Sequence, residues 1–144
     1  HAYAAAAKHD PQVLVEEFVA GQELTASIVN GRALPLIRIV APHGNYDYHS
    51  KYFSDETKYY CPAGLPDALE MAIRATCLAA FDVVGCSGWG RLDLILRDDG
   101  TYSLLEVNTS PGMTGHSLVP MAAKQAGLSY ADLCVEILRG AHVG

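Results

Sequence analysis

The sequence lacks the features that mark several large classes of protein. Its 144 residues carry 10 lysines and arginines against 16 aspartates and glutamates, which gives a formal net charge of −6. A nucleic-acid-binding surface would be basic, so this balance argues against nucleic acid as a partner. No apolar run approaches the length needed to cross a membrane, and no signal peptide is visible. We therefore expect no membrane partner and a cytoplasmic location.

Cysteine spacing and the common nucleotide-binding motifs give equally negative results. The four cysteines include no C-x-x-C pair and no zinc-finger spacing to histidine, so we interpret them as buried, reduced thiols. Residues 85–90 match neither G-x-S-x-G nor G-x-G-x-x-G, and they do not form a Walker A motif. A nucleophile elbow, a Rossmann phosphate loop and a P-loop are thereby excluded.

The sequence does contain clear strand and helix patterns. Half of the residues are hydrophobic and the length suits one domain, so a single core can be buried. Antiparallel hairpins combined with helices predict an α+β fold, a mainly antiparallel sheet flanked by helices. We expect a two-residue turn at Asn30-Gly31 and a loop over 42–54. Strands are expected at 12–19, 23–29, 33–40 and 57–61, a hairpin over 91–107, and helices over 66–84, 118–126 and 129–139.

The hairpin of residues 91–107 carries the most informative polar side chains. Leucines recur at every second position from 92 to 96, the period of a strand with one buried face. Asp99-Gly100 favours a two-residue turn, and a turn there pairs positions whose numbers sum to 199. This pairing places Asp93 opposite Glu106 and Arg91 opposite Asn108.

Two interpretations of this polar face are open. Two carboxylates and an amide oxygen are hard oxygen ligands that suit Mg²⁺, and without a cation the carboxylates repel each other across roughly 4.5–5.5 Å between Cβ atoms. The alternative is an ordinary solvated face of a hairpin. The following loop, Thr109–Gly115, is rich in small residues, hydroxyls and free N–H groups, which suits an anion. The loop favours a metal–phosphate site.

Two long motifs carry a family resemblance. The runs Gly85–Asp93 and Glu106–Met121 resemble the signatures of D-alanine–D-alanine ligases, members of the ATP-grasp superfamily. The likeness continues through Tyr46–Tyr52 and Tyr60–Ala63 and covers nearly the whole chain. It implies that residues 1–144 are a single, partial ATP-grasp domain. The chain starts without methionine, and residues 1–8 are typical of a helix already under way, so we expect the C-terminal portion of a longer ligase.

The resemblance implies a reaction and its cofactors. The complete enzyme would join two D-alanines through an acyl phosphate, using ATP and Mg²⁺, or Mn²⁺ in its place, for peptidoglycan precursors. It would be a homodimer, and the chain alone would be inactive because the N-terminal domain and part of the central domain are absent. Ligation of D-alanine to D-lactate or D-serine remains open as an alternative, and so does a non-catalytic module that binds nucleotide and Mg²⁺.

The resemblance also implies roles for individual residues. The predicted metal ligands are Asp93, Glu106 and Asn108. Arg91 and the backbone N–H near Gly112 are expected to stabilise the charge of the phosphoryl group and of the oxyanion. The predicted nucleotide site comprises Glu16, Glu17, Phe18 and Val19 at the adenine, Glu23 at the ribose and Lys51 at the terminal phosphate. The second amino acid is assigned to Tyr52, Ser117 and the N–H of Leu118, where a helix is expected to begin.

Overall fold

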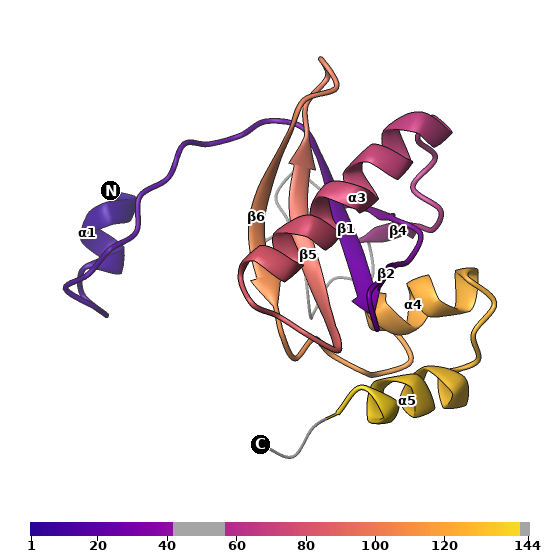
Figure 1. The fold of residues 1–144 in the computed structure, drawn as a ribbon. Coiled ribbons are helices and arrows are strands. Elements are labelled where there is room, and N and C mark those ends of the chain that lie inside the picture. The colour runs from indigo at the N-terminus through magenta and orange to yellow at the C-terminus, as the bar shows by residue number, and fades with distance from the viewer. Residues whose placement is uncertain (42–56, 142–144) are drawn as a thin grey trace.

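The computed structural model describes residues 1–41 and 57–141. Of these, residues from Gln22 onward form one antiparallel sheet with helices on both faces, and the N-terminal residues before them lie apart from it (Figure 1). The sheet has six strands in the order β4-β3-β1-β5-β6, with β2 paired to β1 outside this path. The strands are β1 (Gln22–Val29), β2 (Arg32–Ala33), β3 (Ile37–Val40), β4 (Lys58–Tyr60), β5 (Trp89–Leu96) and β6 (Tyr102–Asn108). The helices are α1 (Ala2–Ala6), α3 (Asp67–Val83), α4 (Leu118–Gln125) and α5 (Tyr130–Arg139). The α+β prediction is confirmed.

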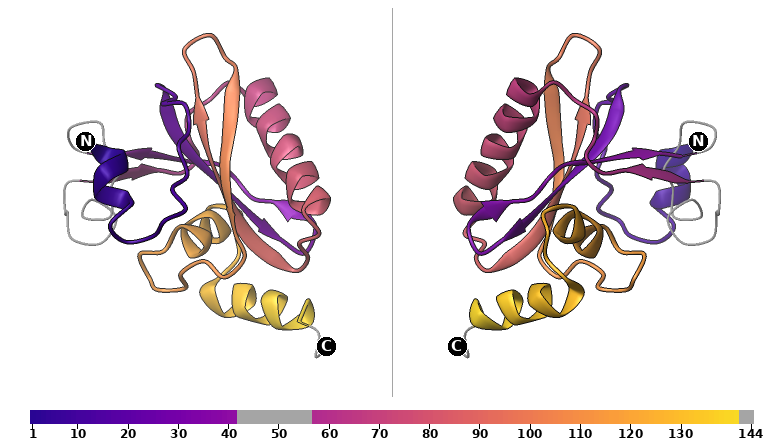
Figure 2. Two further views of the ribbon diagram at one scale, coloured as in Figure 1. Left: turned by 90° about the vertical axis from the view of Figure 1, so that its left-hand side faces the viewer. Right: turned by 90° about the vertical axis from the view of Figure 1, so that its right-hand side faces the viewer.

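Helix α3 lies along one face of the sheet, and α4 lies on the other (Figure 2). One face of β1 and β5 packs against α3, whose buried residues recur at every fourth position: Ile73, Cys77 and Phe81. The second cluster joins β3 and the end of β1 to the apolar sides of α4 and α5. Because both faces of β1 are covered, its last six residues are all buried. This central strand positions the neighbouring β5.

The first hairpin confirms the predicted turn. Asn30 and Gly31 adopt positive φ values of 47° and 73°, as a two-residue hairpin turn requires. The return strand predicted at 33–40 is divided into β2 and β3, both paired with β1. The division coincides with Pro35, which cannot donate a ladder hydrogen bond.

The long helix and the two C-terminal helices also agree with the sequence to within about two residues. Pro66 is the N-cap of α3 rather than its first residue. Ser129 caps α5 in a capping box with Asp132, and the hydrogen bonds from Ser129 hold the pKa of the Asp132 carboxyl below its usual range. The region of residues 1–8 is helical as expected, since it contains α1. No helix of the described residues is long and apolar enough to span a membrane.

All four cysteines are free thiols, as predicted, but the prediction that all four are buried is wrong, because Cys61, Cys86 and Cys134 are partly exposed. Only Cys77 is fully buried, and burial raises its pKa to about 12. The pKa of Cys61 is raised to about 11, first by partial burial and then by the negative charge of Glu70. The Cys61 and Cys77 thiols remain protonated at neutral pH, so their contribution is packing.

The strand predicted at 12–19 is wrong. This segment is extended but has no strand assignment, and its apolar side chains Leu14, Val15 and Phe18 are exposed, Phe18 to 84%. A strand needs a neighbour for its backbone N–H and C=O groups, and none of the described residues supplies one. The apolar residues therefore identify a segment that suits a strand, but no described strand pairs with it.

The predicted two-residue turn at Asp99-Gly100 is also wrong. The loop contains three residues, Asp98 to Gly100, closed by hydrogen bonds from Arg97 N to Thr101 O at 2.8 Å and from Gly100 N to Arg97 O at 3.0 Å. Gly100 has φ +84°, the left-handed conformation that such a loop requires. The residue numbers of the pairs near the turn accordingly sum to 198. Between the partners of Leu94 and Asp93, β6 contains one extra residue, Leu105, which has no partner on β5. The inserted residue restores the sum of 199 beyond it.

Gly90 marks the closest approach between β5 and α3. A Cβ at Gly90 would lie 2.6 Å from Cε2 of Phe81 and 2.9 Å from the backbone oxygen of Asn108. Gly90→Ala is expected to lower the free energy of unfolding by about 1–3 kcal/mol, because the helix or β6 must shift. Urea unfolding followed by circular dichroism measures this change.

Gly115→Ala provides the matched control for Gly90→Ala. Nothing lies within 4 Å of a Cβ at Gly115, so this variant is expected to unfold within about 0.5 kcal/mol of the parent. Equal unfolding midpoints for the two alanine variants would contradict the steric argument.

Candidate functional site

The predicted polar cluster is assembled on the face of the sheet opposite α3. Asp93 pairs with Glu106 and Arg91 pairs with Asn108, as the sequence predicted. The backbone supplies this arrangement because residues of β5 alternate between the α3-facing core and the opposite face. On the other side of β5, Thr25 of β1 lies opposite Asp93. Three adjacent strands therefore contribute side chains to one polar face.

Arg91 and Asp93 form a two-point ion pair at the centre of this face. Arg91 Nε donates to Asp93 Oδ1 at 2.9 Å, and Nη2 donates to Oδ2 at 2.8 Å. The side chains keep only 18% and 9% of their exposure. Parallel charge-assisted hydrogen bonds fix both planar groups in one orientation. The pair holds the Asp93 carboxylate in place toward β6.

The Asn108 side chain bridges the two carboxylates. Its Nδ2 donates to Asp93 Oδ2 and to Glu106 Oε1, each at 3.2 Å. The position of Nδ2 therefore lies within hydrogen-bonding distance of both carboxylates at once. Rotation of the amide by half a turn exchanges Nδ2 for Oδ1, which presents a third oxygen to the same position. The donor set is two carboxylates and one amide oxygen.

This donor set fits Mg²⁺. Magnesium is usually bound by one or two carboxylates, while water and substrate phosphates complete its octahedron. Among the described residues, no group of three or more histidine, cysteine, aspartate and glutamate side chains could hold a metal. A cation here would therefore depend on the amide and on a phosphate ligand. Asp93 is almost fully buried, whereas Glu106 is exposed to solvent.

The loop between β6 and α4 is organised around Ser117. Its Oγ accepts from Thr114 N at 2.9 Å and lies 2.9 Å from Thr114 Oγ1. A Cβ at Gly112 would lie 2.9 Å from the same oxygen, so only glycine fits there without displacement. Leu118 is the first residue of α4, and its N–H is among those that the helix itself leaves without a partner. Gly112, Ser117 and Leu118 are thus brought together.

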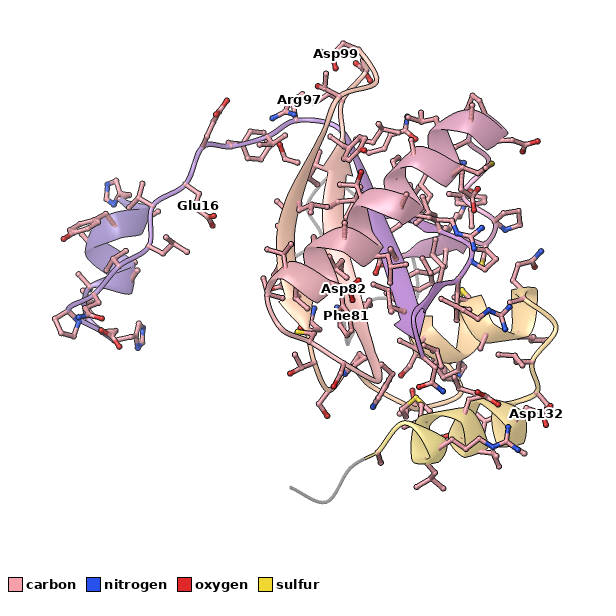
Figure 3. All side chains as sticks on the ribbon, in the orientation of Figure 1. Glu16, Phe81, Asp82, Arg97, Asp99 and Asp132 are labelled. Carbon is pink, nitrogen blue, oxygen red and sulfur yellow. The ribbon has the colours of Figure 1, made fainter. Side chains whose placement is uncertain are left out.

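The structure does not bring every predicted residue to this face. Glu23 lies on it, opposite Ile95 of β5. The predicted adenine residues, 16–19, lie on the extended segment, and Figure 3 shows Glu16 well apart from the sheet. Lys51 and Tyr52 lie outside the described residues. The roles assigned to all of these positions remain predictions.

Sequence reasoning missed two contributions to the site. Ser27 of β1 lies opposite Arg91 of β5. The Oγ of Ser27 is buried without a hydrogen-bond partner among the described residues. Tyr130, at the start of α5, donates its hydroxyl to Met113 O at 2.7 Å. Alternation in 23–29 could have placed Ser27 on a common face with Thr25. The contact from Tyr130 joins residues 17 apart in the chain, and no local pattern signals it.

Comparison with known proteins shows close relatives over the whole chain. The family model described as D-ala D-ala ligase C-terminus matches residues 1–139. The D-alanine–D-alanine ligase of Azoarcus sp. (strain BH72) is 59% identical over 143 residues, which cover 99% of this chain and 47% of that protein. The D-alanine–D-alanine ligase of Janthinobacterium sp. (strain Marseille) is 57% identical and is covered to 45%. The chain thus spans slightly less than half the length of these relatives.

Solved structures show the same fold. The D-alanine–D-alanine ligase from Bacillus anthracis complexed with ATP matches 87% of this chain and 39% of its own, with TM-score 0.72 and 33% identity. The VanG D-Ala:D-Ser ligase from Enterococcus faecalis matches 86% of this chain and 37% of its own, with TM-score 0.75 and 29% identity. The fold is therefore that of the ATP-grasp ligases. Sequence and structure agree that this chain belongs to the D-alanine–D-alanine ligase family and corresponds to the C-terminal part of its members.

Proposed function

We propose that the chain supplies the metal site and part of the nucleotide and second-substrate sites of an ATP-dependent D-alanine–D-alanine ligase. The observation that carries this proposal is the Asn108 amide, which lies 3.2 Å from both the Asp93 and the Glu106 carboxylates. Such a position, flanked by two carboxylates, suits a cation that also binds phosphate. The named relatives are D-alanine–D-alanine ligases, and one similar structure holds ATP.

The proposed reaction begins with phosphoryl transfer. The carboxylate of the first D-alanine attacks the terminal phosphorus of ATP, which forms an acyl phosphate and releases ADP. The amine of the second D-alanine then attacks the acyl carbon, and phosphate leaves as the peptide bond forms. Asp93, Glu106 and Asn108 would hold Mg²⁺, or Mn²⁺, which neutralises phosphate charge when bound.

Arg91 and Gly112 act on the charge that develops during both steps. Arg91 keeps the Asp93 carboxylate fixed through two hydrogen bonds and adds a positive charge beside the phosphates. Because the pair is largely buried, this charge is screened less than it would be in water. Gly112 lacks a side chain, so its backbone N–H can approach an oxyanion closely. Both groups are fixed before reaction.

The second D-alanine is assigned to the start of α4. A hydroxyl has one donor and two acceptor positions, and the two groups of Thr114 can fill both acceptor positions of Ser117. The O–H of Ser117 then remains to donate to a substrate carboxylate together with the N–H of Leu118 at the helix N-terminus. Tyr52 is proposed beside them, while residues 16–19, Glu23 and Lys51 are proposed to contact ATP. The complete protein is proposed to be a cytoplasmic homodimer, with residues 1–144 as one partial ATP-grasp domain.

D-alanine–D-serine ligation is the second candidate. It is favoured by the structural likeness of this chain to the VanG D-Ala:D-Ser ligase, which it matches with a TM-score of 0.75. The fold is common to both reactions, so the second substrate decides between them. D-alanine is the preferred second substrate of this proposal, because the relatives that are 54–59% identical are named D-alanine–D-alanine ligase.

Phosphate release on mixing with ATP, Mg²⁺ and D-alanine tests the proposal. The chain is tested alone and as a chimera preceded by the half of the Azoarcus ligase that it does not match. We expect turnover by the chimera and none by the chain alone, because the remainder of the nucleotide and first-substrate sites must come from outside these residues. Mass spectrometry of the product with D-serine or D-lactate added identifies the second substrate.

The Azoarcus ligase itself is the positive control for this experiment. A folded chimera without turnover, beside an active Azoarcus ligase, would refute the assignment to the ligase reaction. Turnover by the chain alone would refute its dependence on the other half. Circular dichroism and gel filtration establish that the chimera is folded.

A further inference from the structure

A single peptide unit in the loop before α4 has both of its polar groups held by side chains. The carbonyl of Met113 accepts from the hydroxyl of Tyr130 at 2.7 Å. The N–H of the next residue, Thr114, donates to Ser117 Oγ at 2.9 Å. These hydrogen bonds belong to opposite sides of the same planar group, so together they fix its rotation. The two anchoring side chains come from α5 and from the residue that precedes α4.

Only the Gly112–Met113 peptide separates this unit from Gly112. The Cβ position of Gly112 lies 2.9 Å from Ser117 Oγ, so the glycine rests on the hydroxyl that anchors Thr114. Ser117 N also donates to Thr114 O at 3.0 Å, which closes the loop into a compact turn. The Met113 side chain packs against the second hydrophobic cluster. The Met113–Thr114 peptide and Gly112 therefore share one contact, the Ser117 hydroxyl, and a rotation that breaks the bond from Thr114 N frees this hydroxyl to move against Gly112.

Tyr130 is itself held in place. It is the first residue of α5, directly after the Ser129 N-cap, whose hydroxyl forms the capping box with Asp132. Tyr130 is 51% exposed and Met113 is only partly buried, so the hydroxyl does not satisfy a deeply buried carbonyl. Loss of this hydroxyl leaves Met113 O free to bind water instead, at little cost in global stability. The effect of the hydrogen bond is then local orientation.

We propose that Tyr130 is a positioning residue for the Gly112 loop. This inference rests on the proposed function, in which the Gly112 N–H acts on an oxyanion and Ser117 on a substrate carboxylate. Tyr130 is not among the residues proposed to contact either substrate. It fixes the Met113–Thr114 peptide from outside the site, and Ser117 fixes it from inside. An oxyanion donor must be oriented before reaction to stabilise the transition state fully, so the tyrosine raises the rate of the chemical step.

Amide exchange in the chain itself tests the positioning role without any enzymatic assay. Tyr130→Phe removes only the hydroxyl, and exchange of the Thr114 amide is expected to rise about fivefold, the factor that corresponds to one neutral hydrogen bond. Tyr102→Phe is the matched control, because its hydroxyl bonds Thr76 Oγ1 at 2.8 Å between β6 and α3. It is expected to leave exchange at Thr114 unchanged. Equal exchange at Thr114 in Tyr130→Phe and the parent would overturn the inference.

Steady-state kinetics of the chimera supply the second readout. Tyr130→Phe is expected to lower kcat about fivefold with the KM for ATP unchanged, and Tyr102→Phe to leave both constants unchanged. A similar fall in kcat for both variants would show a general structural effect and overturn the inference. If the parent chimera has no ligase activity, the proposed function fails, whereas the exchange experiment still decides whether Tyr130 orients the loop.

Discussion

Glu106→Gln and Asp93→Asn are each expected to lower the Mg²⁺-dependent ligation rate of the chimera by about a thousandfold. A bound metal contributes several kcal/mol to the stabilisation of transition-state charge, and each 1.36 kcal/mol corresponds to about a tenfold change in rate. Either substitution keeps the shape of the side chain but removes one negative charge from the position that Asn108 bridges. The loss should appear mainly as weaker metal binding.

Glu106→Gln is the cleaner of the two variants. Glu106 is exposed, so its replacement should change the free energy of unfolding by less than about 0.5 kcal/mol. Asp93 also pairs with Arg91, so Asp93→Asn disturbs the ion pair and the metal site together. Asp98→Asn at the exposed hairpin tip is the control for an equal change of net charge, and its rate should match that of the parent.

A Mn²⁺ titration of the ATP-saturated chimera, followed by electron paramagnetic resonance, separates metal binding from catalysis. Glu106→Gln should weaken Mn²⁺ binding, whereas Asp98→Asn should not. Parent-like rates and Mn²⁺ affinities in both site variants would identify the face as an ordinary solvated surface. That result would leave the family membership intact and remove the proposed metal ligands.

The pairing of Asp93 with Glu106 agrees with the sequence prediction, although the turn from which it was predicted is wrong. The turn contains one more residue than Asp99-Gly100 predicts, and Leu105 adds one residue to the opposite strand. The two offsets cancel beyond Leu105, so the register at the site is the predicted one. The sequence does not show which residue is inserted, because two adjacent leucines, Leu104 and Leu105, fit either register of the strand.

Other parts of the site depend on contacts between distant segments. The pairing of β1 with β5 brings Thr25 and Ser27 beside Asp93 and Arg91, and this pairing joins residues more than 60 positions apart. Local patterns predict each strand but not which strands are neighbours. The segment 12–19 shows the same limit, because its β-branched and other apolar residues predict a strand that finds no partner among the described residues. Whether a segment forms a strand therefore depends on a neighbouring strand as well as on its own residues.

Arg91→Met is expected to cause the largest loss of stability among the variants considered. It leaves the Asp93 carboxylate, almost fully buried, without the guanidinium that donates two hydrogen bonds to it. Removing one partner of a buried ion pair costs about 3 kcal/mol, the low end of the usual range, because Arg91 keeps 18% exposure. Catalysis should also fall, since the positive charge beside the phosphates is lost.

A double variant distinguishes an orphaned charge from lost packing. Arg91→Met combined with Asp93→Asn removes both charges and should recover most of the lost stability in urea unfolding, without recovering ligase activity in the chimera. Arg139→Met is the matched control, because Arg139 pairs with Glu136 at the exposed surface of α5 and its loss should cost less than about 1 kcal/mol. If Arg91→Met is no more destabilising than Arg139→Met, the ion pair does not hold Asp93 in place. If the double variant is as unstable as Arg91→Met alone, the loss comes from packing of the arginine side chain, and the Asp93 carboxylate is oriented by Asn108 and the backbone of β5.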